Sequence, residues 1–238
     1  MTTTKVRNRY FKADMPVLGT YYSKGEQRII YDGLLDVFAD HLRKRIKNNY
    51  QNIVVVAGGT GSGKSTFAIN LAKKIDPRWD LKKNYIYSTT DLKRKLRNKK
   101  SNPISLFDEG SVSLNSGNSM KKEDKEMVVL FDTMRSRGWT SIICIPSLAS
   151  LNKRIREFHV DYLVICPSRA PIRGYSPRGF WQLYHKERST FSNKAYFDLI
   201  ATGTYPDLTP QMKGHYNKIK FEHQEELIEK FCNDEEID

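Results

Sequence analysis

One stretch of 13 residues decides the fold: Ile53-Val-Val-Val-Ala57-Gly58-Gly-Thr-Gly-Ser-Gly63-Lys64-Ser65. It opens with a continuous apolar and mostly β-branched run, which is typical of a strand buried on both faces in a parallel sheet. The glycines that follow let the backbone curl, because they accept positive φ angles and leave room where a Cβ atom would stand. The amide groups of such a loop point inward, so the stretch predicts a turn that cradles phosphate groups.

The spacing of this loop, a glycine, four residues and then Gly63-Lys64-Ser65, is that of the P-loop of nucleotide-binding proteins. A helix is predicted directly after it, because apolar residues recur at helical spacing as far as Pro77. We therefore expect ATP as the ligand, with Lys64 serving catalysis at the β- and γ-phosphates and Ser65 binding Mg²⁺. A flexible Gly/Ser turn is the alternative, but such a turn does not require the Lys-Ser pair. The residues expected to bind the nucleotide are Gly58, Gly59, Thr60, Gly61, Ser62, Gly63, Lys64, Ser65 and Thr66.

Two carboxylates end the next buried strand, in the stretch Ile104-Ser-Leu-Phe107-Asp108-Glu109. The carboxyl edge of a parallel sheet faces the ligand crevice, so both side chains are expected near the P-loop. Asp108 is predicted to hold Mg²⁺, and Glu109 to activate the attacking water as a general base. The alternative is a pair that only caps the following helix.

Strand-like and helix-like segments alternate along the rest of the chain. Strands are expected at 85–87, 104–107, 141–145 and 160–166, and helices at 91–100, 123–137 and 148–158. This alternation predicts an α/β fold, a P-loop NTPase whose mainly parallel central sheet is covered by helices.

Three parts are expected along the chain. Residues 1–50 should form an N-terminal arm, irregular or with short strands up to about residue 32, and a lead-in helix. Residues 51–204 should form the P-loop ATPase core, with an edge hairpin made by 180–185 and 195–199. Residues 205–238 should form a C-terminal helix and an acidic tail.

The order of these motifs resembles the RecA-like class of P-loop proteins, which carries an additional strand and a catalytic glutamate. The stretch Met134-Arg-Ser-Arg-Gly-Trp-Thr-Ser-Ile-Ile143 is similar to the one that follows the acidic strand in the HerA/FtsK lineage. That lineage comprises DNA-pumping ATPases, including viral genome-packaging motors and the Zot-like proteins of mobile elements. The resemblance covers about residues 52–166. It implies an ATP-driven translocase of double-stranded DNA that works as a homo-oligomeric ring, with a portal or other virion protein as a further partner.

The resemblance also implies an arginine finger, which neutralises charge on the phosphates bound by a neighbouring subunit. Arg135 and Arg137 are the expected catalytic arginines, and Arg154 and Arg156 are further candidates. Arginines at helix ends are also favoured simply by the helix dipole. Where the lineage often has a polar glutamine sensor, this chain has Pro146-Ser147, so Ser147 is the candidate sensor.

The net charge of +13 favours a polyanionic partner, nucleic acid first, although it also serves solubility. Three segments could contact DNA. The segment 169–188 interleaves arginines with aromatic residues, but alternating aromatics also suit the buried face of a hairpin. The segment 111–119 is predicted to form either a loop that contacts DNA in the pore of a ring or an ordinary surface loop. The densest positive cluster is Lys93, Arg94, Lys95, Arg97, Lys99 and Lys100.

Several classes of protein are disfavoured. The apolar runs are too short to cross a bilayer, and the polar, basic start does not resemble a secretory signal, so we expect a cytoplasmic protein, in the host cytoplasm if viral. The three cysteines are odd in number, and Cys144 and Cys166 lie in apolar runs, which argues against disulfides or a zinc site. Two alternatives stay open: a small P-loop kinase, and a Zot-like protein that uses ATP as an assembly switch.

Overall fold

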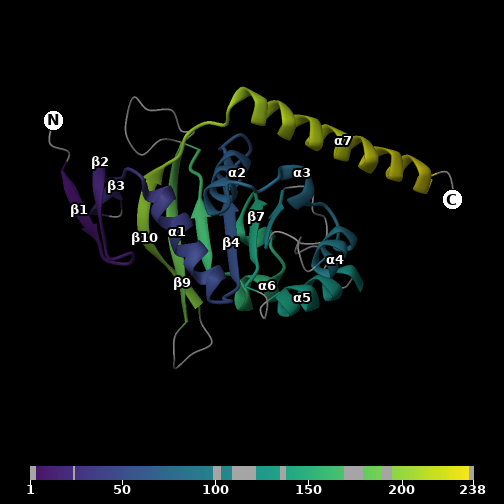
Figure 1. Ribbon diagram of the computed structural model, residues 1–238, viewed down its shortest axis with the longest axis horizontal. Helices are drawn as coiled ribbons and strands as arrows, with labels where there is room; N and C mark the ends of the chain where they lie inside the picture. The colour runs from purple at the N-terminus through teal and green to yellow at the C-terminus, as the bar shows by residue number, and fades with distance from the viewer. Residues whose placement is uncertain are drawn as a thin grey trace.

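The structure is a computed structural model of the chain (Figure 1), and it describes residues 4–23, 25–98, 103–108, 122–134, 138–168, 179–188 and 195–235. Three predicted catalytic residues, Glu109, Arg135 and Arg137, lie outside the described residues. The predicted loop at 111–119 and the arginine-rich stretch at 169–178 also lie outside them.

One mixed sheet runs through the described part of the molecule, in the order β1-β2-β3-β10-β9-β8-β4-β7-β6-β5. The strands are β1 (Lys5–Asn8), β2 (Ala13–Ser23), β3 (Glu26–Tyr31), β4 (Asn52–Ala57), β5 (Tyr85–Ile86), β6 (Ile104–Phe107), β7 (Thr140–Ile145), β8 (Tyr162–Ile165), β9 (Phe180–Arg188) and β10 (Ala195–Thr204). The five strands β8, β4, β7, β6 and β5 are all parallel to one another. This confirms the predicted α/β fold with a mainly parallel central sheet.

The P-loop strand β4 and the acidic strand β6 are not neighbours, because β7 lies between them. Ile142 of β7 pairs with Val54 of β4 on one side and with Leu106 of β6 on the other. All three strands run in the same direction, so their carboxyl ends meet at one edge of the sheet. The inserted strand is the feature of the additional-strand class that the sequence resembles.

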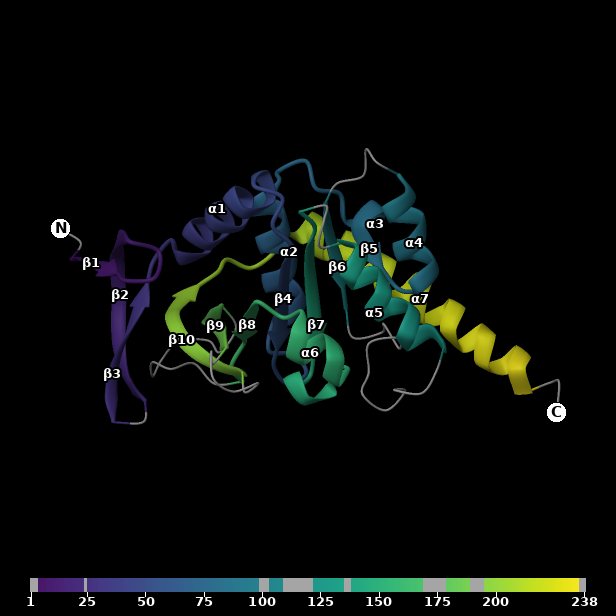
Figure 2. The same cartoon turned by 90° about the horizontal axis from the view of Figure 1, so that it is seen from below.

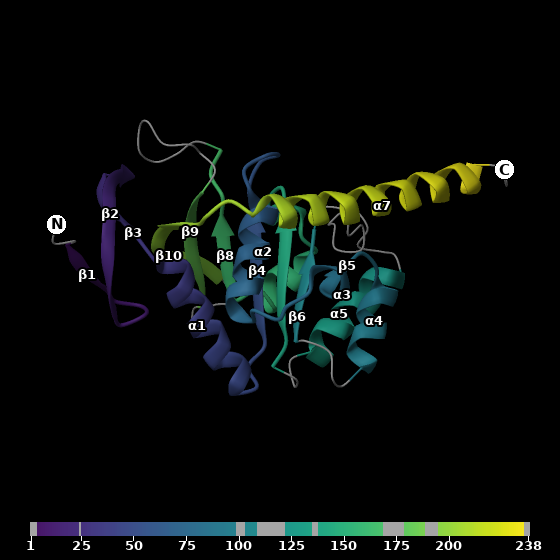
Figure 3. The ribbon, with the colours of Figure 1, turned by 45° about the horizontal axis from the view of Figure 1, so that its top comes forward.

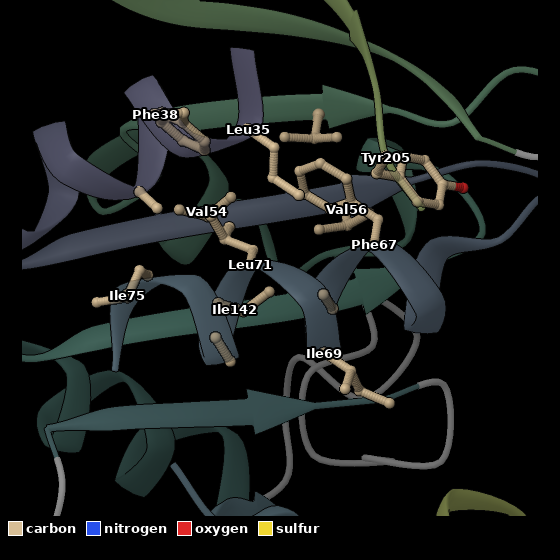
Figure 4. Close-up of a cluster of buried hydrophobic side chains, with 14 of the residues drawn as sticks. Leu35, Phe38, Val54, Val56, Phe67, Ile69, Leu71, Ile75, Ile142 and Tyr205 are labelled. Carbon is tan, nitrogen blue, oxygen red and sulfur yellow. The ribbon is translucent and has the colours of Figure 1, made fainter. Parts of the chain in front are cut away.

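Helices cover both faces of the sheet. They are α1 (Leu34–Lys47), α2 (Lys64–Ile75), α3 (Leu81–Asn84), α4 (Thr89–Arg97), α5 (Lys122–Met134), α6 (Lys153–Phe158) and α7 (Pro210–Glu235). One buried cluster packs α1 and α2 on β4, where Leu35, Phe38 and Phe67 meet Val54 and Val56 (Figure 4). A second cluster packs α4, α5 and α6 against the other face. The alternation of side chains along β4 supplies both clusters, as expected for a strand buried on both faces.

The expected helix at 148–158 forms in two pieces. A 3₁₀ turn at Leu148–Ser150 comes first, and α6 begins only at Lys153. Asn152 lies between them and caps α6, because its side chain accepts a hydrogen bond from the Arg154 amide. A cap residue has non-helical backbone angles, which interrupts the predicted continuous helix.

The N-terminal arm contains more regular structure than the sequence predicts. β1, β2 and β3 form antiparallel pairs, and β3 then joins the sheet by pairing parallel to β10 (Thr202 with Ile30). Figure 2 shows these three strands at one end of the molecule. The hairpin of β9 and β10 exists as predicted, but it is not the sheet edge, because β3 covers it.

The C-terminal helix α7 crosses the carboxyl edge of the sheet and then runs beyond the body (Figure 3). Ile219 anchors it in the core, and the Tyr87 hydroxyl donates a hydrogen bond to the Ile219 carbonyl at 3.1 Å. The Tyr87 ring also stacks on His223, with ring centroids 3.7 Å apart. Within the ranges that the structure covers, no helix is both long and apolar enough for a transmembrane segment.

Candidate nucleotide-binding site

The P-loop connects the end of β4 to the start of α2, as the sequence predicts. Gly61 and Gly63 have φ angles of 74° and 93°, in the left-handed region that favours glycine. A Cβ atom at Gly63 would lie 2.3 Å from the Tyr205 hydroxyl, so this glycine is also required by close packing. No side chain of the described residues caps α2. The first-turn amides of a helix have no acceptor within it, and the positive end of the helix dipole favours an anion there.

Lys64 is the first residue of α2, and its side chain folds back over the loop. It is buried, and its Nζ donates hydrogen bonds to the carbonyls of Gly58 at 2.9 Å and Gly59 at 3.1 Å. The ammonium charge is thereby held against the loop and away from bulk solvent.

The two predicted metal ligands lie together. The Ser65 hydroxyl donates to Asp108 at 3.0 Å (Oδ2) and 3.2 Å (Oδ1), although the residues are 43 positions apart. Asp108 follows β6 directly and is only 3% exposed. A hydroxyl beside a carboxylate offers the hard oxygen ligands that Mg²⁺ prefers.

Two tyrosines that the sequence analysis did not select also bind Asp108. The hydroxyls of Tyr85 and Tyr216 donate to its Oδ2 atom at 3.1 Å and 2.5 Å. Burial raises the pKa of both tyrosines, and the Asp108 carboxylate raises each pKa further. Both hydroxyls therefore keep their protons and remain donors to Asp108.

These residues fit a Mg²⁺-bound nucleoside triphosphate. The Ser62 hydroxyl is buried inside the loop without a hydrogen-bond partner among the described residues, which suits a phosphate oxygen. A cavity of about 260 Å³ opens over the loop. Its lining residues are Thr60, Gly61, Gly63, Lys64, Ser65, Thr66, Leu208, Lys213, Tyr216, Asn217 and Lys220. Four of these come from α7, for which the sequence analysis predicted no role at the site.

The other candidate residues on described segments do not reach this cavity. The Ser147 hydroxyl accepts a hydrogen bond from the Ala149 amide at 3.2 Å, which gives it a local capping role. Arg154 lines a separate cavity of about 930 Å³ at the opposite edge of the sheet, together with Gln51 and Asp161 at the starts of β4 and β8. Arg156 donates to the Ala149 carbonyl at 3.4 Å.

The predicted basic cluster is only partly a free positive surface. Lys95 is buried, and its Nζ donates to the Ile104 carbonyl at 2.5 Å and to the Ser105 hydroxyl at 3.1 Å. Burial lowers the pKa of Lys95 to about 7. Lys93 pairs with Glu126 of α5 at 2.5 Å, and Arg94 pairs with Asp91 at 2.8 Å. Lys95 is therefore excluded from a contact with a phosphate backbone, whereas the Arg94 side chain is 82% exposed in its ion pair.

Two aromatic residues of β9 also lie inside the fold. Phe180 is 3% exposed and Trp181 is fully buried, so neither can stack on a nucleic-acid base. The Trp181 ring instead packs on Phe67 of α2, with centroids 4.7 Å apart. Cys144 and Cys166 are buried, as expected for thiols that act as small apolar side chains.

No protein-family model matches the chain, and no curated protein matches it by sequence. Among solved structures, the chain is similar to the genome packaging NTPase B204 from Sulfolobus turreted icosahedral virus 2 in complex with ATP-gammaS. The identity is 14% and the TM-score 0.41, over 66% of this chain and 98% of that one. The same NTPase in complex with sulfate gives 14% identity and a TM-score of 0.42, over 66% and 98% of the two chains.

The chain is also similar to the N-terminal domain of zonular occludens toxin from Neisseria meningitidis. The identity is 13% and the TM-score 0.40, over 67% of this chain and 96% of that one. A viral packaging NTPase and a Zot domain are the two kinds of protein that the sequence resemblance names. Identities and TM-scores this low leave the function to be inferred from the chain's own residues.

Proposed function

We propose that this chain is a Mg²⁺-dependent ATPase that drives the movement of double-stranded DNA, in viral genome packaging or in transfer of a mobile element. One observation supports the ATPase most directly. The Ser65 hydroxyl of the P-loop lies 3.0 Å from Oδ2 of Asp108, which follows β6 at the carboxyl edge of the sheet. A phosphate-binding loop next to a buried carboxylate is the arrangement needed to hold a triphosphate and its metal ion.

Each residue has a distinct task in the proposed hydrolysis. The loop amides and Lys64 bind the β- and γ-phosphates, and Ser65 and Asp108 hold the metal. Mg²⁺, when bound, neutralises charge that develops on the phosphate oxygens. Glu109, which follows Asp108 in the sequence, accepts a proton from the attacking water, and ADP and phosphate leave.

The DNA-moving role rests on the charge and on the family resemblance. The net charge of +13 attracts a polyanion at long range. A ring of copies around duplex DNA, with Arg135 or Arg137 completing the neighbour's site, is the proposed working form. A portal or other virion protein is the partner expected if the cargo is a viral genome.

An ATPase assay with and without duplex DNA tests this proposal. ATP should be converted to ADP and free phosphate without any small acceptor, and duplex DNA should raise the rate. Because DNA binding releases counterions, this stimulation should fall as salt rises from 50 to 200 mM, roughly the range in which such contacts weaken by orders of magnitude. Turnover that DNA does not change would leave the assembly switch as the better description.

The same assay addresses the kinase alternative, if candidate small acceptors are added. A kinase lid needs arginines over its own P-loop, but Arg154 lies at the opposite edge of the sheet in the same chain. Transfer of the phosphoryl group to an acceptor, in place of water, would overturn the hydrolase proposal.

Substitutions of the two carboxylates are expected to impair hydrolysis in different ways. Glu109→Gln should keep Mg·ATP binding but lower kcat by about 10²–10⁴, the usual contribution of a general base. Asp108→Asn should in addition raise the Mg²⁺ concentration needed for half-maximal activity, because it weakens a metal ligand. Steady-state kinetics across a Mg²⁺ titration measure both effects. If Glu109→Gln hydrolyses ATP at the parent rate, another residue is the base.

A further inference from the structure

One face of α7 lies over the P-loop. Lys213, Tyr216, Asn217 and Lys220 all line the phosphate cavity. Their spacing of three, four and seven residues places them on a single side of the helix. Lys218, by contrast, belongs to the outer side, where it is 75% exposed and lies 3.9 Å from Glu222. The helix thus presents two lysines, an amide and a hydroxyl to the site proposed for the triphosphate.

Tyr216 reaches deeper than the other three residues. Its hydroxyl lies 2.5 Å from Asp108 Oδ2 and donates a hydrogen bond to that oxygen. Mg²⁺ in proteins usually keeps several of its waters, and these waters are also hydrogen-bond donors. The Tyr216 hydroxyl and a metal-bound water therefore compete for the same carboxylate oxygen.

The segment that leads into α7, residues 205–209, is called its root. This root is firmly held, whereas α7 itself is weakly buried. At the root, the Tyr205 hydroxyl donates to the Gly63 carbonyl at 3.2 Å, and the Asn70 amide donates to the Pro206 carbonyl at 2.8 Å. Among the α7 side chains that the structure describes, only Ile219 is buried. Beyond the root, the helix is also held by the Tyr87 hydrogen bond to the Ile219 carbonyl and by the stack of Tyr87 on His223. An element with few buried apolar contacts opens at low free-energy cost. The helix can therefore shift when these contacts break, while its root stays tied to the P-loop.

We propose that α7 is a lid on the nucleotide site, in which Tyr216 holds Asp108 until Mg·ATP enters and Lys220 and Asn217 then bind the phosphates. This lid rests on the proposed ATPase function. Lys213 is a weaker phosphate ligand, because it already pairs with Asp207 at 2.7 Å. Lys220 is half-buried and faces the cavity directly, so it is the main cationic contact.

Lys220→Met and Lys218→Met form a matched pair for the first test. Binding of the β,γ-methylene analogue of ATP with Mg²⁺ is measured by calorimetry on the full chain. Lys220→Met should weaken binding roughly tenfold or more, the usual effect of losing a charge-assisted hydrogen bond. Lys218→Met should bind like the parent. Equal affinities in both variants would overturn the phosphate-binding role of α7.

Tyr216→Phe tests the competition for Asp108. Removing the hydroxyl should lower the Mg²⁺ concentration that half-saturates analogue binding, by up to about tenfold. An unchanged or higher Mg²⁺ concentration would show that Tyr216 supports the metal site. It would overturn the proposal that Tyr216 competes with the metal for Asp108. Hydrogen exchange of the amides between 213 and 220 should change when the Mg²⁺-bound analogue is added to the parent protein, and no change would contradict a lid.

These outcomes are separable from failure of the proposed ATPase. If the parent protein binds no Mg²⁺-bound analogue, the nucleotide site itself is refuted. If the parent binds the analogue and the three α7 results are absent, only the lid is refuted.

Discussion

Lys64→Ala is expected to lower ATP turnover by at least about 10²–10³ and to weaken nucleotide binding, because no other P-loop residue can supply its charge. Lys64 is 4% exposed and lies against the Gly58 and Gly59 carbonyls, so its ammonium is already in place before a phosphate arrives. Preorganised charge in a site shielded from water acts strongly on the transition state. Release of phosphate and equilibrium binding of an ATP analogue measure the two effects.

Lys73→Ala is the matched control, because Lys73 belongs to the same helix but contacts the Pro77 carbonyl beyond its far end. It should retain the parent turnover. Near-normal hydrolysis by Lys64→Ala would remove the P-loop assignment, whatever the DNA dependence of the remaining activity.

Loss of the arginine finger should lower turnover by about 10³ or more, the range known for other P-loop enzymes. Arg135→Ala and Arg137→Ala are the first variants to measure, and Arg154→Ala and Arg156→Ala extend the series. If the finger acts on a neighbouring subunit, activity per subunit should also rise with protein concentration. The matched control is Arg78→Ala, because Arg78 is 93% exposed and lies in the turn after α2.

Mixing two inactive variants distinguishes a finger that acts between subunits from one that acts within a chain. Glu109→Gln subunits still offer an arginine, and subunits without the finger still have intact metal and base residues. A mixture should therefore recover activity, because the first kind of subunit completes the sites of the second. If mixing restores nothing and turnover is independent of protein concentration, the ring mechanism fails.

The sequence predicts the central part of the site well, for a local reason. The P-loop motif is continuous along the chain, and β4, β6 and β7 are mostly apolar, so burial on both faces is visible without knowing their partners. The proximity of Ser65 and Asp108 then follows from the common direction of parallel strands.

The N-terminal strands and the tyrosines around Asp108 were missed for the opposite reason. β2 buries only Met15 among residues that are otherwise exposed or half-exposed, and its register shifts between Val17 and Gly19. Its sequence therefore shows no clean alternation of apolar and polar residues. Tyr216 contacts Asp108 across 108 positions, and helical spacing on α7 does not reveal what lies beneath it.

The burial of Lys95 could have been predicted from the sequence. Lys95 shares a helix face with the buried Leu92 and Leu96, so its position three residues after Leu92 already indicates burial. The long side chain then reaches the Ile104 carbonyl. The charge of this run of basic residues suggested an exposed surface. The helical spacing of Lys95 from Leu92 indicates instead that Lys95 is buried.

The overhang of α7 gives the molecule a long lever. From Tyr216 to Glu235 the helix extends about 28 Å, and its far part runs beyond the body of the protein (Figure 3). A tilt of only about 10° near Tyr216 displaces the tip by about 5 Å, more than the rise of roughly 3.4 Å between successive base pairs of duplex DNA. A small change of helix direction at the nucleotide site is thereby amplified into a displacement of several ångströms at the far end of α7.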